Sequence, residues 1–391
     1  MQRWISWAAL ALALFAFYLY VRPPEPSENH LPKQLPEVPE QVPVTREHPK
    51  QNKQAEPKLP LAAPKHQEQE TLAEPPLHTA QTAKKPGFTL PLDCNFGENC
   101  WVARYSDRNP SSDKADYMCG RRTQNNHKGT DFAIANYGIM QRGISVLAVD
   151  AGKVLRTRDT MQDISVQITG RKAIKGKECG NAAFIQHANG ITTQYCHMRK
   201  GSLTVKPGDK VARGQKIGLL GLSGDTEYPH LHLNVRKDKK RIDPFDGQKL
   251  STVCSQSAND SLWENAPAYT QMDLLPLVFS SEPLTRRTRW QEQPVRLQTN
   301  TPALILTGIA WNVLAGDRWQ FTIMRPDGTR ATSQRLTAKE NRQSQWYANR
   351  LFRPVDGFMP GVWKGKLTVT RQDTSGTTSR FERETEILVA H

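Results

Sequence analysis

The segment from His230 to Arg236 alternates strictly between polar and apolar side chains. Successive side chains of a β-strand point to opposite faces, so a strand here gathers all of its apolar side chains on one face. That face holds Leu231, Leu233 and Val235, and the opposite face holds His230, His232, Asn234 and Arg236. A helix would scatter the same apolar side chains around its circumference. The segment therefore predicts a sheet that covers a core with one face and carries two histidines on the other.

Residues 89–250 continue this β pattern. Runs such as Val146–Val149, Lys153–Leu155 and Ile217–Gly221 are separated by turns that contain glycine. No amphipathic helix longer than about ten residues is predicted among them. We therefore predict one all-β domain over residues 89–250.

A second group of short strands is predicted near the C-terminus. Trp319–Ile323 alternates, and Leu304–Ile309 and Lys366–Thr370 read as further strands. This spacing predicts a β-sandwich over residues 271–391, joined to the first domain by a connector over 251–270. Its resemblance to appended immunoglobulin-like domains is architectural only. The sandwich sequence contains no catalytic cluster, so we expect it to position substrate, to bind a protein partner or simply to stabilise the chain.

The first 88 residues are predicted to lie outside the folded domains. The stretch from Trp4 to Val21 has Ser6 as its only polar side chain. At 1.5 Å per residue its helix is about 27 Å long, close to the hydrocarbon core of a bilayer. No small-residue cleavage site follows, which favours an uncleaved signal anchor over residues 1–21 rather than a cleaved signal peptide. Residues 22–88 hold 14 of the 27 prolines and predict a disordered linker.

The net charge of +15 comes almost wholly from the part of the chain that is predicted to fold. Residues 1–88 carry ten Lys and Arg against nine Asp and Glu, which leaves +14 for the remainder. Such a balance favours an anionic partner, such as nucleic acid, phospholipid or an acidic polymer. No single basic block stands out in the folded part, so we expect no nucleic-acid partner.

Six cysteines lie beyond the export segment, and an even number suggests disulfides outside the cytoplasm. Two predicted strands over 181–187 and 191–197 fold back around an Asn-Gly turn, which brings Cys179 near Cys196. Fifteen pairings of six cysteines exist. For the other four, the short loop suggests Cys94–Cys100 and leaves Cys119–Cys254 as the remainder, and free buried thiols are the alternative.

Three short motifs bring histidines to the edges of predicted strands. His127 precedes Asp131 by four residues, and a glycine between them favours a tight loop entering a strand over a helix. His197 ends another predicted strand, and His230 and His232 share a strand face. A catalytic zinc takes three nitrogen or oxygen ligands from the protein and one water in tetrahedral geometry. Two histidines and the aspartate would supply three ligands and leave two histidines for proton transfer.

Together these motifs resemble those of the lysostaphin-type (LytM-domain) zinc metallopeptidases. HKGTD at 127–131, YCHM at 195–198 and PHLHLNVR at 229–236 are similar to the family's three motifs and occur in the same order. The runs over 143–154 and 205–218 resemble the segments between those motifs. The resemblance implies an antiparallel β-fold with zinc on the floor of a groove. It also implies hydrolysis of peptide crosslinks in bacterial peptidoglycan.

The resemblance, which covers roughly residues 118–246, implies a role for each site residue. The ligands of one zinc per chain would be His127, Asp131 and His232, and the residues beside the zinc-bound water and the scissile carbonyl would be His197 and His230. Zinc lowers the pKa of bound water to about 7 and polarises the carbonyl. One neutral histidine can take the proton of that water, and the other can stabilise the oxyanion.

One stretch departs from the family's pattern. Residues 156–178 are longer than a minimal family member needs between two strands, and they are rich in charged side chains. We expect them to form either a wall of the groove or a solvated loop. His187 lies at a strand-to-turn corner, where we expect a structural role rather than metal binding.

The expected protein is a zinc endopeptidase of the cell envelope that hydrolyses the peptide crosslinks of peptidoglycan. Its substrates would be stem peptides in the periplasm or another extracytoplasmic space. Residues 4–21 would anchor it to the inner membrane, and the sandwich would offer a surface for a protein partner. This function follows from the resemblance, and the positive charge suits it without selecting it.

Two other functions stay open at the level of sequence. The first is a non-catalytic LytM-like regulator of a cell-wall amidase. Such regulators usually lack some zinc residues, whereas this chain keeps all five site positions. The second is a zinc protease that acts on extracellular proteins.

Overall fold

The computed structural model describes residues 87–250, 254, 260–373 and 375–391. The anchor predicted over residues 4–21 and nearly all of the predicted linker lie outside these ranges. Among the described helices, none has the length and apolar character needed to cross a membrane.

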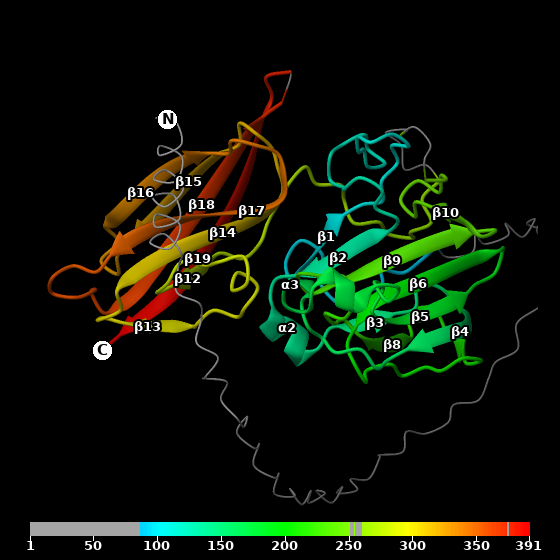
Figure 1. Ribbon diagram of the computed structural model, residues 1–391. Coiled ribbons are helices and arrows are strands. Elements are labelled where there is room, and N and C mark those ends of the chain that lie inside the picture. Colours follow the sequence, from blue (N-terminus) through cyan, green and yellow to red (C-terminus); the bar gives the residue numbers. More distant parts are fainter. Residues whose placement is uncertain (1–86, 251–253, 255–259, 374) are drawn as a thin grey trace, which may run out of the picture. The chain divides into compact units, whose positions relative to one another are not determined.

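An eight-stranded sheet dominates the first half of the described chain (Figure 1). Its order is β1-β2-β9-β6-β5-β4-β7, with β10 paired to β9. The strands are β1 (Cys100–Arg104), β2 (Thr130–Ile134), β4 (Gly152–Arg158), β5 (Asn181–Gln186), β6 (Ile191–Met198), β7 (Lys210–Val211), β9 (His230–Lys237) and β10 (Lys240–Ile242). Two further strands, β3 (Ser145–Leu147) and β8 (Lys216–Leu219), form a separate pair. All of these pairings are antiparallel, which confirms the predicted fold class.

The alternation that predicted β9 is the reason for its position in this sheet. Leu231, Leu233 and Val235 are at most 1% exposed and belong to the core beneath the sheet. The polar face is also sheltered, since His230 is only 4% exposed and Asn234 only 7%. This face therefore forms the floor of a cavity rather than an open surface.

Helices are short in this half of the described chain. The helix α2 (Tyr137–Arg142) begins where the side chain of Asn136 accepts a hydrogen bond from the backbone N–H of Ile139. It ends at Gly143, whose φ of 96° suits a residue without a Cβ. The helix α3 (Val166–Thr169) and the 3₁₀ helix η1 (Arg171–Ile174) occupy the stretch over 156–178 that departs from the family's pattern.

All six cysteines form disulfides in the predicted pairs. Cys179–Cys196 ties the segment before β5 to β6, with a Cα–Cα distance of 4.8 Å. The other pairs are Cys94–Cys100 and Cys119–Cys254. The hairpin formed by β5 and β6 therefore brings its cysteines together as its sequence predicted.

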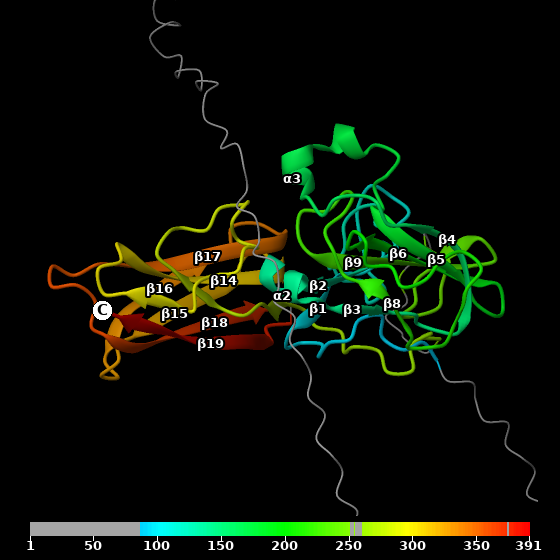
Figure 2. The same ribbon diagram turned by 90° about the horizontal axis from the view of Figure 1, so that it is seen from below.

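The second half of the described chain forms two sheets, shown in a second view in Figure 2. One contains β11 (Asp273–Leu274), β14 (Ala303–Val313), β12 (Val278–Ser280) and β17 (Arg342–Phe352). The other has the order β13-β19-β18-β15-β16 and comprises β13 (Arg296–Gln298), β15 (Arg318–Met324), β16 (Arg330–Thr337), β18 (Gly361–Gln372) and β19 (Thr378–Ala390). These strands include the three runs predicted near the C-terminus.

The two sheets face each other across one core, which confirms the predicted β-sandwich. A Cβ placed on Gly365 of β18 would lie 2.6 Å from the side chain of Leu306 in β14. The reverse holds at Gly308 of β14, where a Cβ would lie 2.4 Å from the side chain of Leu367. Such contacts require the close approach that glycine permits. The domain boundaries at residues 250 and 270 stay predictions.

A separate aromatic cluster connects β1, the segment between β12 and β13, and β14. It contains Trp101, Trp290 and Trp311, each at most 1% exposed. Trp290 and Trp311 stack with ring centroids 5.5 Å apart and planes 16° apart. Tyr228, just before β9, packs against both indoles. The cluster therefore ties the start of β9 to the sheet that contains β14.

Candidate metal centre

The register of three neighbouring strands brings the predicted site residues together. Asp131 of β2 lies directly opposite His232 of β9, and Cys196 of β6 lies opposite His232 from the other side. His197 follows Cys196 at the end of β6, and His230 lies two residues before His232 on the same face. The loop before β2 carries His127. All five predicted residues therefore meet on the polar face of one sheet.

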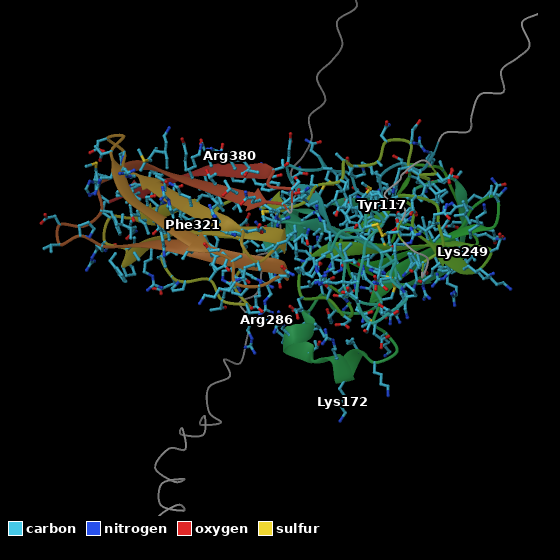
Figure 3. The ribbon with its side chains drawn as sticks, turned by 90° about the horizontal axis from the view of Figure 1, so that it is seen from above. Tyr117, Lys172, Lys249, Arg286, Phe321 and Arg380 are labelled. Atoms are coloured by element: carbon cyan, nitrogen blue, oxygen red, sulfur yellow. A yellow bond between two sulfur atoms is a disulfide. The ribbon has the colours of Figure 1, made fainter. Side chains whose placement is uncertain are left out.

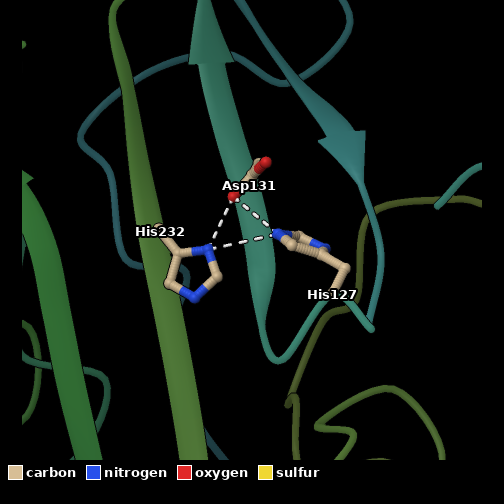
Figure 4. A group of neighbouring side chains, drawn as sticks. All are labelled: His127, Asp131 and His232. Carbon is tan, nitrogen blue, oxygen red and sulfur yellow. Dashed lines mark hydrogen bonds and ion pairs between the residues drawn. The ribbon is translucent and has the colours of Figure 1, made fainter. Parts of the chain in front are cut away.

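Three donor atoms converge as a metal site requires (Figure 4). Nε2 of His127 lies 3.2 Å from Oδ1 of Asp131 and 3.2 Å from Nδ1 of His232. Nδ1 of His232 lies 2.8 Å from the same Oδ1. Zinc ligands at about 2.0–2.1 Å in a tetrahedron are about 3.3 Å from one another. The donor types and their spacing therefore fit zinc.

In His127 and His232, the ring nitrogen that does not point to the proposed metal position has a hydrogen-bond partner in the protein. Nδ1 of His127 donates to the carbonyl of Tyr105 at 2.7 Å, which leaves Nε2 free to bind a metal. The amide of Asn234 lies 3.0 Å from Nε2 of His232. Oδ1 of Asn234 is buried and has no hydrogen-bond partner among the described residues. An amide turned to accept the Nε2 proton satisfies that oxygen and leaves Nδ1 of His232 as the ligand atom.

His197 and His230 are anchored in the same manner. Nδ1 of His197 donates to the carbonyl of Ser223 at 2.8 Å, and Nδ1 of His230 donates to the carbonyl of Tyr228 at 2.9 Å. Nε2 of His230 lies 3.5 Å from Oδ1 of Asp131, and the two ring centroids are 4.7 Å apart. Burial lowers the pKa of His197 well below its usual value, and the neighbouring His230 and His232 lower it further. A neutral imidazole at this position can accept a proton.

The backbone of His197 adopts an unusual conformation. Its φ of 62° lies in the left-handed region, which few non-glycine residues occupy. Two hydrogen bonds hold it there, from its own N–H to the carbonyl of Cys179 and from the N–H of Gly221 to its carbonyl. The adjacent Cys179–Cys196 disulfide fixes the same segment. Strain held in this way at a site is typical of functional positions.

Asp131 is a buried carboxylate in the middle of the site. Burial by itself would raise its pKa, but His127 and His230 hold the pKa of this carboxyl well below its usual value. The guanidinium of Arg104 lies 3.7 Å from its Oδ2. The carboxylate is therefore ionised at neutral pH and available as a metal ligand.

Gly129 allows the loop of His127 to approach β9. A Cβ at this position would lie 2.5 Å from the carbonyl oxygen of Leu233 and 2.7 Å from Nε2 of His232. Any larger side chain would displace a proposed ligand. The glycine that argued against a helix in the sequence is therefore needed for close packing in the structure.

Sequence reasoning did not identify Tyr228 as part of this site. Its ring stacks on that of His230, with centroids 4.5 Å apart and planes 28° apart. Its other neighbours include Trp311, at 4.9 Å between centroids. The only sequence signal was its position two residues before His230, and nothing in the sequence indicated its aromatic partners.

The site opens into a cavity of about 890 Å³. Its described lining includes nine Lys and Arg side chains but only four Asp and Glu. Arg171 and Glu178 are part of that lining, so the stretch over 156–178 contributes to a wall of the cavity. Of the two expectations for this stretch, a groove wall or a solvated loop, the structure agrees with the wall. His187 lies elsewhere, with Nδ1 2.9 Å from the carbonyl of Ala151 and Nε2 2.7 Å from the hydroxyl of Thr193.

Comparisons with known proteins find relatives that match part of this chain. The peptidoglycan DD-endopeptidase ShyA of Vibrio cholerae is 38% identical over 109 residues, which are 28% of this chain and 20% of that protein. An uncharacterized metalloprotease of Buchnera aphidicola is 35% identical over 118 residues, which are 30% of this chain and 25% of that protein. The chain thus spans a quarter or less of the length of these relatives. The crystal structure of a zinc containing peptidase from Vibrio cholerae is 26% identical, with a TM-score of 0.24, and covers 37% of this chain and 39% of that one.

The family comparison matches residues 125–244 to peptidase family M23. The matched range contains all five residues of the site and the strands β2, β6 and β9 that position them. This chain therefore carries a peptidase domain of family M23, the LytM type.

Proposed function

We propose that this protein is a zinc-dependent endopeptidase that hydrolyses the peptide crosslinks of peptidoglycan in the cell envelope. The observation that carries the proposal is the convergence of His127, Asp131 and His232 beside two further histidines whose Nδ1 atoms are bound to backbone carbonyls. The name of the relative from Vibrio cholerae supports peptidoglycan as the substrate.

The protein's own residues would divide the chemistry between them. His127, Asp131 and His232 would hold zinc, which supplies a water of lowered pKa and polarises the scissile carbonyl. His197, neutral and held by Ser223, would accept the proton of the attacking water. His230, when protonated on Nε2, would stabilise the developing oxyanion and donate that proton to the leaving amine, and the proton accepted by His197 would then restore the one that His230 has lost.

The placement of the protein is part of the proposal. Three disulfides support an oxidising, extracytoplasmic compartment. Residues 4–21 would anchor the chain in the inner membrane, and a protein partner would bind the sandwich over 271–391. The positively charged lining of the cavity suits an acidic polymer.

Digestion of purified sacculi tests the proposed substrate. We expect the zinc-loaded full-length protein to convert crosslinked muropeptide dimers into monomers, with new peptide ends identified by mass spectrometry. The metal-free protein should release none, and added zinc should restore the release. A His197→Ala variant that retains zinc serves as the inactive control.

The same experiment separates the alternatives. Intact dimers after treatment with the zinc-loaded protein would contradict the proposal. Cleavage of a denatured protein substrate in place of sacculi would then support a protease of extracellular proteins. Stimulation of an added cell-wall amidase without any cleavage of its own would support the regulator.

A further inference from the structure

Several arginines along the cavity have carboxylate partners. Arg286 donates to Oε1 of Glu227 at 2.5 Å, and Arg171 donates to the carboxylate of Asp225 at 3.3 Å. Figure 3 shows Arg286 on the same side of the molecule as α3, whose Gln167 also donates to Glu227. These pairs largely neutralise the charges that they contain.

Arg289 lines the same cavity without such a partner. Its side-chain nitrogens make no hydrogen bond or ion pair with any residue that the structure describes, and its Nε is buried. The residue is only 9% exposed. Burial lowers its pKa, and Glu227 offsets part of that effect from a distance. A guanidinium that is buried in this way carries a desolvation cost that a directly bound anion would repay.

Aromatic rings fix the orientation of Arg289. Its guanidinium carbon lies 4.9 Å from the ring centroid of Trp290 and 4.4 Å from that of Trp346. Cation–π contacts of this kind contribute about 0.5–2 kcal/mol. A guanidinium is planar and directs its N–H groups along its own plane, which is the geometry that a carboxylate accepts in bidentate fashion. The charge is therefore held in a pre-organised position.

The position of Arg289 connects it to the proposed site. Trp290 packs on Tyr228 at 5.3 Å between centroids, and Tyr228 stacks on His230 at 4.5 Å. Arg289 and His230 both line the cavity. A peptide placed for hydrolysis beside His230 would therefore extend along a wall that contains this cation.

We propose that Arg289 binds a free carboxylate of the peptide substrate, away from the scissile bond, and makes the cavity selective for peptides that carry one. The proposal rests on the proposed peptidase function and names its substrate class. A carboxylate rather than a phosphate is expected, because the proposed substrate is a peptide.

The test uses two crosslinked peptides that differ only in one carboxylate, free in the first and amidated in the second. The zinc-loaded wild-type protein should prefer the free acid through a lower KM. Arg289→Gln should raise the KM for the free acid by about 10–100-fold, the range expected for a lost charged hydrogen bond. It should change kcat, and the KM for the amide, by less than about threefold. Arg289→Lys, which keeps the charge but loses the planar edge, should fall between the two.

Arg286→Gln is the matched control, since it removes one positive charge from the same cavity but from an existing ion pair. It should leave the preference for the free acid unchanged. An equal rise in KM for both peptides in Arg289→Gln, or an unchanged preference, would overturn the proposal. Thermal unfolding of each variant, compared with the wild type, identifies losses that come from folding.

A second measurement distinguishes failure of the carboxylate site from failure of the proposed peptidase function. If the wild type hydrolyses neither peptide, calorimetry measures binding of the same two peptides to the wild type and to Arg289→Gln. Tighter binding of the free acid that is lost in the variant would support the carboxylate site by itself. Equal binding of both peptides to the wild type would overturn it.

Discussion

At the scale of single residues, His230 and His232 differ in what holds their rings, although they share a face of β9. Nδ1 of His232 lies among the proposed ligand atoms, whereas Nδ1 of His230 is taken up by the carbonyl of Tyr228. His232→Ala should therefore lose bound zinc and turnover together. His230→Ala and His197→Ala should keep about one zinc per chain while turnover drops by about 10²–10⁴-fold. Elemental analysis and hydrolysis of crosslinked muropeptides measure the two quantities.

The opposite pattern would reverse the assignment within the pair. Loss of zinc in His230→Ala with retention in His232→Ala would show that His230 is the ligand. Full turnover in all three variants would place the active site elsewhere.

Asp243 gives a prediction about pH and stability. Burial raises its pKa to about 7, and its Oδ2 has no hydrogen-bond partner among the described residues. An unfolded Asp has a pKa of about 3.9, so between about pH 4 and 7 the folded chain keeps a proton that the unfolded chain releases. This group therefore lowers the free energy of unfolding as the pH rises through that window. Asp243→Asn should remove the loss and make the chain more stable than the wild type at pH 8 by about 2–4 kcal/mol.

Urea unfolding of both chains at pH 5 and pH 8 measures this difference, because the other titrating groups are common to both. The gain from Asp243→Asn should be clearly smaller at pH 5. A gain that is equal at the two pH values, or a loss at pH 8, would contradict the interpretation.

At the scale of elements, the hairpin of β5 and β6 holds His197 in its left-handed conformation. The double substitution Cys179→Ala/Cys196→Ala should lower the free energy of unfolding by about 3 kcal/mol, since the bond closes a loop with a sequence separation of 17. Turnover should also fall, because His197 donates its N–H to the carbonyl of Cys179. Chemical unfolding and kinetics measure the two effects.

Cys94→Ala/Cys100→Ala is the matched control, with a sequence separation of 6. It should lower stability by a smaller amount and leave kcat near that of the wild type at a temperature where both variants are folded. An unchanged kcat in the variant without the Cys179–Cys196 bond would show that this disulfide has no part in placing His197.

The sequence predicted best those elements whose pattern depends only on residues that are neighbours in the chain, such as an alternating strand or a two-residue turn. The alternation over 230–236 identified β9 and its core face, and an Asn-Gly turn identified the hairpin that joins Cys179 to Cys196. The three histidine motifs were found because metal chemistry restricts residue types and spacing. Tyr228 and Arg289 were missed because their roles come from packing between distant segments, for which neither periodicity nor spacing gives a signal.

At the scale of the whole molecule, the aromatic cluster links the start of β9 to β14. Trp311→Ala should lower the free energy of unfolding by about 3–5 kcal/mol, as expected for a large side chain removed from a core. It should also lower kcat, because Trp311 packs on Tyr228 and Tyr228 stacks on His230. Thermal unfolding and kinetics well below the melting temperature measure the two effects.

Trp319→Ala provides the comparison, since Trp319 is equally buried but packs on Phe321 and Tyr347 within the sandwich. It should cost similar stability without lowering kcat. Equal kcat values in the two variants would contradict a role for the aromatic cluster in positioning His230.

The sequence predicted the sandwich itself but not this contact, because strand patterns indicate which faces are buried and not which partner buries them.

The central claim is that this sheet holds a zinc ion between His127, Asp131 and His232. Diffraction data collected from crystals of the full-length protein on both sides of the zinc absorption edge test it directly. We predict one anomalous peak at about 2.0–2.2 Å from Nε2 of His127, Oδ1 of Asp131 and Nδ1 of His232. A zinc peak bound by other side chains, or no peak at this site in protein that contains one zinc per chain, would contradict the claim.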